Sequence, residues 1–243
     1  MTTSAFDTNP LNFQLDIIYE EGSVIAINKP AGILTQSPPG IDSLELHVKK
    51  YLIEKEQKTG KCYLGIPHRL DRPASGLIVF AKNSRAANRL SEQFESRMVQ
   101  KKYWAIVSGM IEDDEGTWID YMRKIPGRAE AEIRAPIHPD AREAVLHFFV
   151  KKRWNNQTWL EIELETGRTH QIRLQCGSRG FPLLGDQLYG STVPFGTQFA
   201  DDRLRSIALH SREMTFSHPQ TREKIVLVAP ISKTWESTGI FKD

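Results

Sequence analysis

One short segment carries the residue types with the clearest chemical potential. In residues 68–82, HRLDRPASGLIVFAK, Asp71 lies between Arg69 and Arg72, immediately before an apolar run. Neighbouring cations favour the ionised form of a carboxylic acid, and an ionised aspartate on a rigid scaffold can act as a nucleophile or a general base. From this segment alone, Asp71 could equally cap a turn and pair with an adjacent arginine.

A second segment concentrates polar donors. In ETGRTHQIRLQ (165–175), Thr169 is predicted to cap a helix. Arg168 and His170 would then lie at the mouth of that helix, with Arg173 one turn further in. An ordinary amphipathic helix does not require so many polar donors, although a surface ion-pair cluster would also explain them.

Several other chemistries lack their sequence signals. The seven histidines show no HxxxH or Cys/His ligand spacing, so no metal is expected. There is no GxGxxG or GxxxxGK[ST] motif for a nucleotide, and Ser75 lies in ASG rather than in the GxSxG of a serine nucleophile. Cys62 and Cys176 have no CxxC spacing and are expected to be reduced thiols.

Composition and charge describe an ordinary globular protein. With 243 residues, 40% of them hydrophobic, the chain is too long for a peptide hormone or disulfide mini-protein. No apolar run approaches the roughly 18 residues of a membrane helix, and no signal peptide is recognisable, so a cytoplasmic protein is expected. The net charge is +2, but residues 60–102 hold nine Lys or Arg against three acids. This stretch is either a phosphate-facing strip or a solvated helix face.

Short apolar runs between turn residues predict many strands and few helices. Strands are expected over 16–20, 23–29, 76–82, 102–108, 116–121, 143–152, 158–165, 212–217 and 223–229. Helices are expected over 44–57 with Ser43 as N-cap, to about residue 97 after a cap at Asn83 or Ser84, and from Thr169. Because short turns join most strands, we expect one α+β domain over 16–243, with a mixed, mainly antiparallel sheet and flanking helices. Residues 1–15 would form an N-terminal tail.

The two chemical segments and PLLGDQLYG (182–190) resemble, in this order, motifs of the RluA-type pseudouridine synthases. Three further pieces agree: YEEGSVIAINKPAG (19–32), KKYWAIVSG (101–109) and IALHSREMTFSHPQTRE (207–223). The resemblance covers roughly residues 16–230. It implies an isomerase that converts uridines of transfer RNA or large-subunit ribosomal RNA to pseudouridine in a central RNA-binding cleft, without a cofactor.

The resemblance also implies roles for individual residues. The family's catalytic aspartate falls on Asp71, its active-site tyrosine on Tyr103 and its partner arginine on Arg173. Asp71 would attack the sugar at C1′ or deprotonate it to give a glycal, and the residues do not choose between these routes. Tyr103 would stack on the extruded base, and it could also help remove the C5 proton; without the resemblance it would be read as a half-buried strand aromatic. Arg69 matches the arginine that enters the RNA stack; RNA contacts are also expected from Arg72, Arg168 and His170.

Three positions depart from the family pattern. Ala74 stands where threonine is usual, Gln175 where histidine is common, and Ser211 where alanine usually follows Leu-His. None of them is a predicted catalytic residue, so they leave the predicted activity intact and put substrate preference in question.

Two other classes of function stay open at this point. A non-catalytic RNA-binding or ribosome-assembly factor would share the basic stretch but would not need the three catalytic residues together. A retaining glycosidase would need a second carboxylate near Asp71, for which only Glu165 is available in the two chemical segments. Because only residues 1–15 precede the first motif, we expect the short family form without an N-terminal S4 domain, acting as a monomer.

Overall fold

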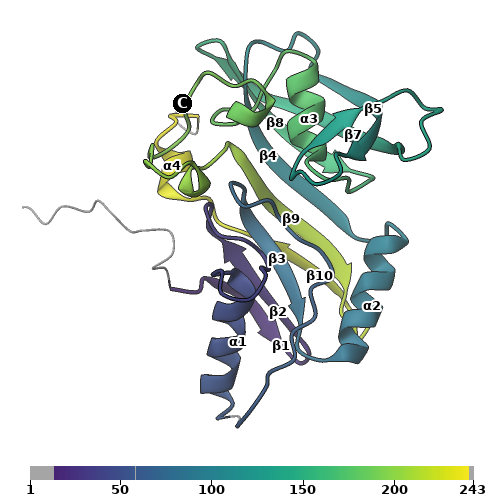
Figure 1. Cartoon of the computed structure of the whole chain (residues 1–243), viewed down its shortest axis with the longest axis vertical. Coiled ribbons are helices and arrows are strands. Elements are labelled where there is room, and N and C mark those ends of the chain that lie inside the picture. Colours follow the sequence, from purple (N-terminus) through teal and green to yellow (C-terminus); the bar gives the residue numbers. More distant parts are fainter. Residues whose placement is uncertain (1–13, 58, 241–243) are drawn as a thin grey trace, which may run out of the picture.

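The computed structural model describes residues 14–57 and 59–240, which form one curved ten-stranded sheet with four α-helices (Figure 1). The strands are β1 (Ile17–Glu21), β2 (Val24–Lys29), β3 (Ser75–Ala81), β4 (Gln100–Ser108), β5 (Glu115–Lys124), β6 (Ala131–Ile133), β7 (Arg142–Trp154), β8 (Gln157–Leu164), β9 (Leu209–Ser217) and β10 (Lys224–Val228). The helices are α1 (Leu44–Lys55), α2 (Ser84–Glu95), α3 (Gln171–Ser178) and α4 (Lys233–Glu236). The predicted tail over 1–15 lies almost wholly outside the described residues.

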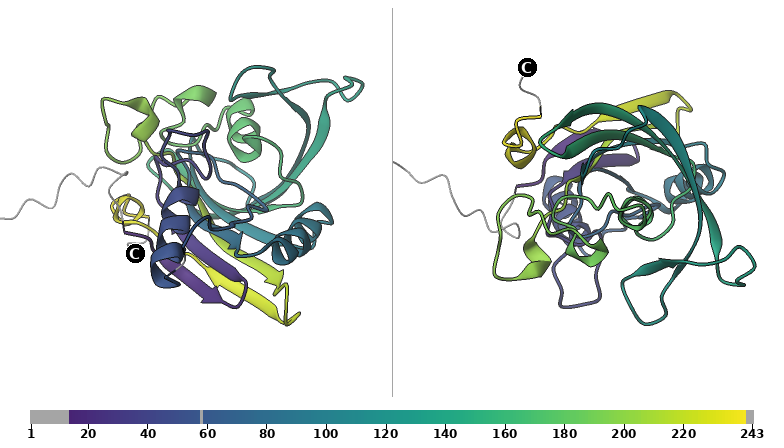
Figure 2. Two further views of the ribbon diagram at one scale, coloured as in Figure 1. Left: turned by 60° about the horizontal axis from the view of Figure 1, so that its bottom comes forward. Right: turned by 90° about the horizontal axis from the view of Figure 1, so that it is seen from above.

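The strands follow the order β1-β2-β3-β9-β4-β8-β7-β5-β6, and β10 pairs with β9. Only the β3–β9 pair is parallel among these strands. The sheet bends strongly, and from above β5 and β7 curve around α3 (Figure 2). The predicted α+β class with a mixed, mainly antiparallel sheet is therefore confirmed.

Both faces of β2 are covered, which explains its uninterrupted apolar run. Ile25 and Ile27 belong to the core cluster that includes the buried face of α1. Val24 and Ala26 point the other way, into the cluster that includes α2. Because successive side chains of a strand alternate between faces, a strand buried on both sides must be apolar throughout.

The strands β1, β2 and β3 join the rest of the sheet through a short parallel contact between β3 and β9, just after Asp71 in the chain. Only Ser75 and Gly76 of β3 pair with β9, opposite His210 and Ser211. Gly76 has a φ of +109°, and a Cβ there would lie 2.4 Å from the carbonyl oxygen of Ser211. The close approach of β3 to β9, just after the Asp71 loop, therefore requires glycine.

We expect Gly76→Ala to lower the free energy of unfolding by about 3 kcal/mol or more, since it combines backbone strain with a backbone clash. Gly60 is the matched control, because its φ is also +109° but nothing lies within 4 Å of its added Cβ. Gly60→Ala should cost only about 1 kcal/mol. Urea denaturation of both variants measures the difference, and equal losses would show that the contact with β9 does not control stability.

The structure differs from the expected elements mainly at short pieces. The strand β6, the helix α4 and the two 3₁₀ turns Gln187–Tyr189 and Asp202–Leu204 were not predicted, because three or four residues are too few to show a period. Asn83 caps α2 as expected, accepting a hydrogen bond from the Ala86 amide at 2.9 Å. Ser43 occupies the N-cap of α1, but its hydroxyl makes no capping bond.

Two further expectations concern the cysteine thiols and membrane-spanning helices. Cys62 and Cys176 are both free thiols, as predicted. In the part of the chain that the structure describes, no helix has the length and apolar character needed to cross a bilayer.

Candidate active site

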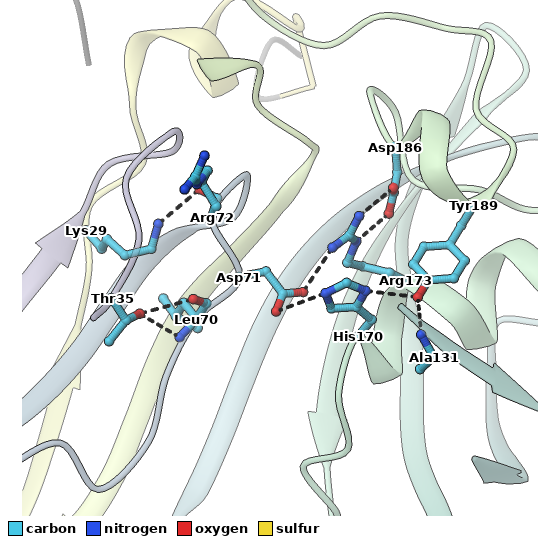
Figure 3. A network of polar contacts seen from close by, with 10 residues as sticks. All are labelled: Lys29, Thr35, Leu70, Asp71, Arg72, Ala131, His170, Arg173, Asp186 and Tyr189. Atoms are coloured by element: carbon cyan, nitrogen blue, oxygen red, sulfur yellow. Dashed lines mark hydrogen bonds and ion pairs between the residues drawn. The ribbon is translucent and has the colours of Figure 1, made fainter. Parts of the chain in front are cut away.

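Asp71 faces a buried ion pair formed by Arg173 and Asp186. Arg173 donates from Nε and Nη2 to the two carboxylate oxygens of Asp186, at 2.7 and 2.8 Å. Its remaining nitrogen, Nη1, reaches Asp71 Oδ2 at 3.3 Å (Figure 3). Burial opposes the charge of Arg173, but the two carboxylates together raise its pKa above the ordinary value. The predicted partnership of Arg173 with Asp71 is therefore present, although the shorter bonds go to Asp186.

Asp186 was not predicted as a site residue, although its motif was noted. It follows Leu183, Leu184 and Gly185, and its side chain is only 1% exposed. The signal that could have indicated it is a single acid in an apolar, glycine-containing motif. Such an acid is expected to be buried, and a buried carboxylate needs a cationic partner. The sequence does not say which of the chain's cations that partner is.

His170 faces the second carboxylate oxygen of Asp71, beside Arg173 (Figure 3). Its Nε2 lies 3.7 Å from Asp71 Oδ1, and its Nδ1 lies 2.9 Å from the hydroxyl of Tyr189. The Tyr189 hydroxyl also accepts a hydrogen bond from the Ala131 amide at 3.1 Å. Burial lowers the pKa of His170, outweighing the opposite influence of Asp71. The imidazole is therefore neutral at neutral pH and contacts Asp71 as a dipole rather than as a cation.

The start of α3 differs from the prediction that Thr169 caps it. The N-cap is His170, in a left-handed conformation with a φ of +53°. The side chain of Gln171 holds this turn instead, because its Oε1 accepts from the Arg168 amide at 3.0 Å and from the Thr166 hydroxyl at 2.8 Å. This arrangement brings His170 to Asp71.

The loop of Asp71 is fixed on both sides of the aspartate. On one side, Thr35 Oγ1 exchanges hydrogen bonds with the carbonyl and amide of Leu70, at 3.0 and 3.1 Å. On the other, Lys29 Nζ donates to the carbonyl of Arg72 at 3.2 Å. Burial lowers the pKa of Lys29 to about 7. Sequence reasoning gave neither Lys29 nor Thr35 a role, yet they anchor the backbone that presents Asp71.

Tyr103 of β4 completes the site as a protonated phenol. Its residue is 8% exposed and lines the same cavity as Asp71. Burial raises the pKa of Tyr103 to about 12, and the charge of Asp71 acts in the same direction. At neutral pH the hydroxyl can donate a hydrogen bond but is not a phenolate base.

The cavity beside Asp71 has a volume of about 100 Å³ and opens beside a groove of about 540 Å³. Arg69, Tyr103 and Arg168 line both. Of the predicted site residues, the cavity gathers Asp71, Tyr103, Arg173, Arg69, Arg168 and His170. Arg72 is not among its lining residues, and Figure 3 shows it on the Lys29 side of Asp71.

Among the three departures from the family pattern, only Ala74 lines the cavity. Gln175 lies in α3 and donates to Asp120 Oδ2 at 2.8 Å, so it ties the helix to the sheet. Ser211 is buried opposite Gly76 in the β3–β9 contact.

No carboxylate is placed to serve as a glycosidase acid near Asp71 among the described residues. Glu165 contacts His147 at 2.6 Å and lines the groove rather than the Asp71 cavity. Asp186 is enclosed and paired with Arg173. A retaining glycosidase needs an accessible second carboxyl group, so the geometry disfavours that function.

Comparison with known proteins gives a consistent result. Residues 23–178 match a family described as RNA pseudouridylate synthase. The chain is 34% identical over 237 residues to an uncharacterized RNA pseudouridine synthase of Synechocystis sp., covering 95% of this chain and 69% of that protein. It is 35% identical over 230 residues to ribosomal large subunit pseudouridine synthase D of Haemophilus ducreyi, covering 91% and 69%. The solved structure of human RNA pseudouridylate synthase domain containing 4 has a TM-score of 0.75 at 20% identity, over 92% of this chain and 91% of that one.

Proposed function

The chain belongs to the RNA pseudouridylate synthase family of isomerases, and we propose that it acts on specific uridines of structured RNA with Asp71 as its nucleophile. The observation that carries the assignment of Asp71 is its contact with the buried Arg173–Asp186 pair at the wall of a cavity. Relatives at 32 to 35% identity are named ribosomal large subunit pseudouridine synthase D, which favours large-subunit ribosomal RNA over transfer RNA as the substrate. RNA is the partner, and we propose the RluA type, acting as a cytoplasmic monomer.

The reaction transfers the glycosidic bond at C1′ from N1 to C5 of uracil, with loss of a proton at C5 and gain of one at N1. The bond from N1 of uracil to C1′ breaks, the base turns, and C5 bonds to C1′; the C5 proton leaves and N1 gains one. Asp71 would either form an ester at C1′ or remove a sugar proton to give a glycal. Both routes need a carboxylate, whose charge the neighbouring guanidinium of Arg173 stabilises.

The remaining roles concern access to the base. C1′ and C5 cannot be reached inside a stacked helix, so the uridine would flip into the cavity, where Tyr103 would stack on the base. Arg69 is exposed and lines the cavity, a place from which its side chain would fill the gap left in the RNA. Arg168 and His170 would contact the RNA at the cavity wall, whereas Arg72 would meet it only from the Lys29 side.

The purified protein is expected to release tritium from RNA labelled at uridine C5, with one tritium released for each pseudouridine formed. Release should continue in excess EDTA, because the proposed chemistry uses only protein groups. Unmodified transcripts of transfer RNA and of large-subunit ribosomal RNA are tested separately, with pseudouridine mapped by carbodiimide modification and primer extension. Binding without release from either RNA would contradict the proposed activity, and activity lost in EDTA and restored by zinc would contradict its independence from metal.

A further inference from the structure

The groove beside the Asp71 cavity combines cations with an apolar wall. Four cationic side chains line it: Arg69, Arg97, Lys101 and Arg168. They come from separate segments, since Arg97 follows α2, Lys101 lies in β4 and Arg168 precedes α3. Its apolar wall includes Pro67, Phe94, Tyr103 and Leu164.

None of these four cations has an acidic partner among the described residues. Within residues 14–57 and 59–240, no ion pair includes Arg69, Arg97, Lys101 or Arg168. Two other cations of the basic stretch over 60–102 are paired. Lys82 lies 3.2 Å from Glu20, and Lys102 lies 3.6 Å from Glu163. Lys82 and Lys102 are therefore satisfied surface charges, whereas the groove cations have no acid paired with them among the described residues.

These cations are also close enough for each charge to disfavour the protonated form of its neighbours. Burial lowers the pKa of Lys101 and of Arg168, and in both the charge of Arg97 adds to the effect. The groove contains two acids, Glu95 and Glu165, of which Glu165 already contacts His147 at 2.6 Å. Gathering like charges costs free energy, and a bound anion would offset that cost.

The apolar wall is suited to a nucleobase. The ring of Phe94 stacks on His68 with centroids 4.5 Å apart, which fixes its position. Tyr103 lines both the groove and the Asp71 cavity. Aromatic faces are where single-stranded nucleic acids place their bases, and cations beside them bind the backbone.

We propose that this groove binds the nucleotide next to the target uridine, with its phosphate held by Arg97, Lys101 and Arg168 and its base against Phe94. The proposal rests on the proposed function, which places the uridine itself in the adjoining cavity. Because three segments converge on one phosphate, the contact would set the register of the RNA strand relative to Asp71.

The test measures how RNA affinity depends on salt, in an Asp71→Asn background that needs no turnover. The probe is a short oligouridylate, and the slope of log K against log salt counts the phosphates neutralised, at about 0.7 per phosphate for single strands. Lys101→Gln should weaken binding and reduce the magnitude of the slope, whereas Lys102→Gln should change neither. Lys102 is the matched control, since it is the next residue of β4 and lies 3.6 Å from Glu163.

A double variant tests whether the three cations share one phosphate. Arg97→Asn combined with Lys101→Gln should reduce the slope by no more than about 0.7 in total, because both residues contact the same phosphate. Asparagine suits this position, where φ is +60°. A slope for Lys101→Gln equal to that of Lys102→Gln, or a loss of about 1.4 in the double variant, would overturn the proposal. Failure of tritium release by the wild-type protein would instead contradict the proposed function.

Discussion

Asp71→Asn is expected to abolish tritium release from labelled RNA while leaving RNA affinity nearly unchanged. Asparagine keeps the size of the side chain and can still accept from Arg173 Nη1, which lies 3.3 Å from Asp71 Oδ2 in the wild type. An amide cannot act as nucleophile or base at neutral pH, so turnover should fall below detection. The loop should keep its shape, since Thr35 and Lys29 hold the backbone on either side through Leu70 and Arg72.

Single-turnover assays with excess enzyme measure the rate, and filter binding on the same transcript measures the affinity. Asp42→Asn is the control, because Asp42 is an exposed aspartate whose contact with His47, at 2.9 Å, lies outside the cavity. A measurable rate for Asp71→Asn would show that another group acts as the nucleophile or base. A large loss of affinity would mean instead that Asp71 serves mainly in binding.

The sequence predicted those parts of the fold whose signals are local. Expected strands at 23–29 and 76–82 agree with β2 and β3 within one residue, since their apolar runs end at turn residues. Asn83 was predicted as a helix cap because capping depends on residues a few positions apart. Thr169 was predicted by the same rule and was wrong, because the helix begins one residue later, after His170 in a left-handed conformation, and Gln171 holds the preceding turn through the Arg168 amide.

Contacts between distant segments were predicted only where the family resemblance supplied them, as for Asp71 and Arg173. Arg69 and Arg72 flank Asp71 in the sequence and seemed equivalent, but the loop leaves only Arg69 at the cavity. The bonds from Arg173 to Asp186 join a helix to a later turn. No periodic pattern marks a pairing across such a connection, so it becomes evident only when the chain is folded.

The Arg173–Asp186 pair leads to the second large effect, a fall in kcat on the order of a hundredfold in Asp186→Asn. The variant leaves a buried guanidinium with Asp71 as its only carboxylate partner within 4 Å in the described structure. Removing one partner of a buried pair costs about 3–5 kcal/mol, and Arg173 is expected to shift from its place beside Asp71. KM should change little, because Asp186 is not among the residues lining the cavity.

A double-mutant cycle separates this positioning role from general destabilisation. If Asp186 acts through Arg173, adding Asp186→Asn to Arg173→Ala should lower kcat no further, since the group that Asp186 orients is already gone. Asp201→Asn is the matched control: Asp201 also accepts from two nitrogens of one arginine, Arg203, but both side chains are exposed, so its loss should leave kcat and thermal stability nearly unchanged. Thermal unfolding verifies that each variant is folded at the assay temperature. Additive losses in kcat would mean that Asp186 contributes to catalysis by a route that does not pass through Arg173.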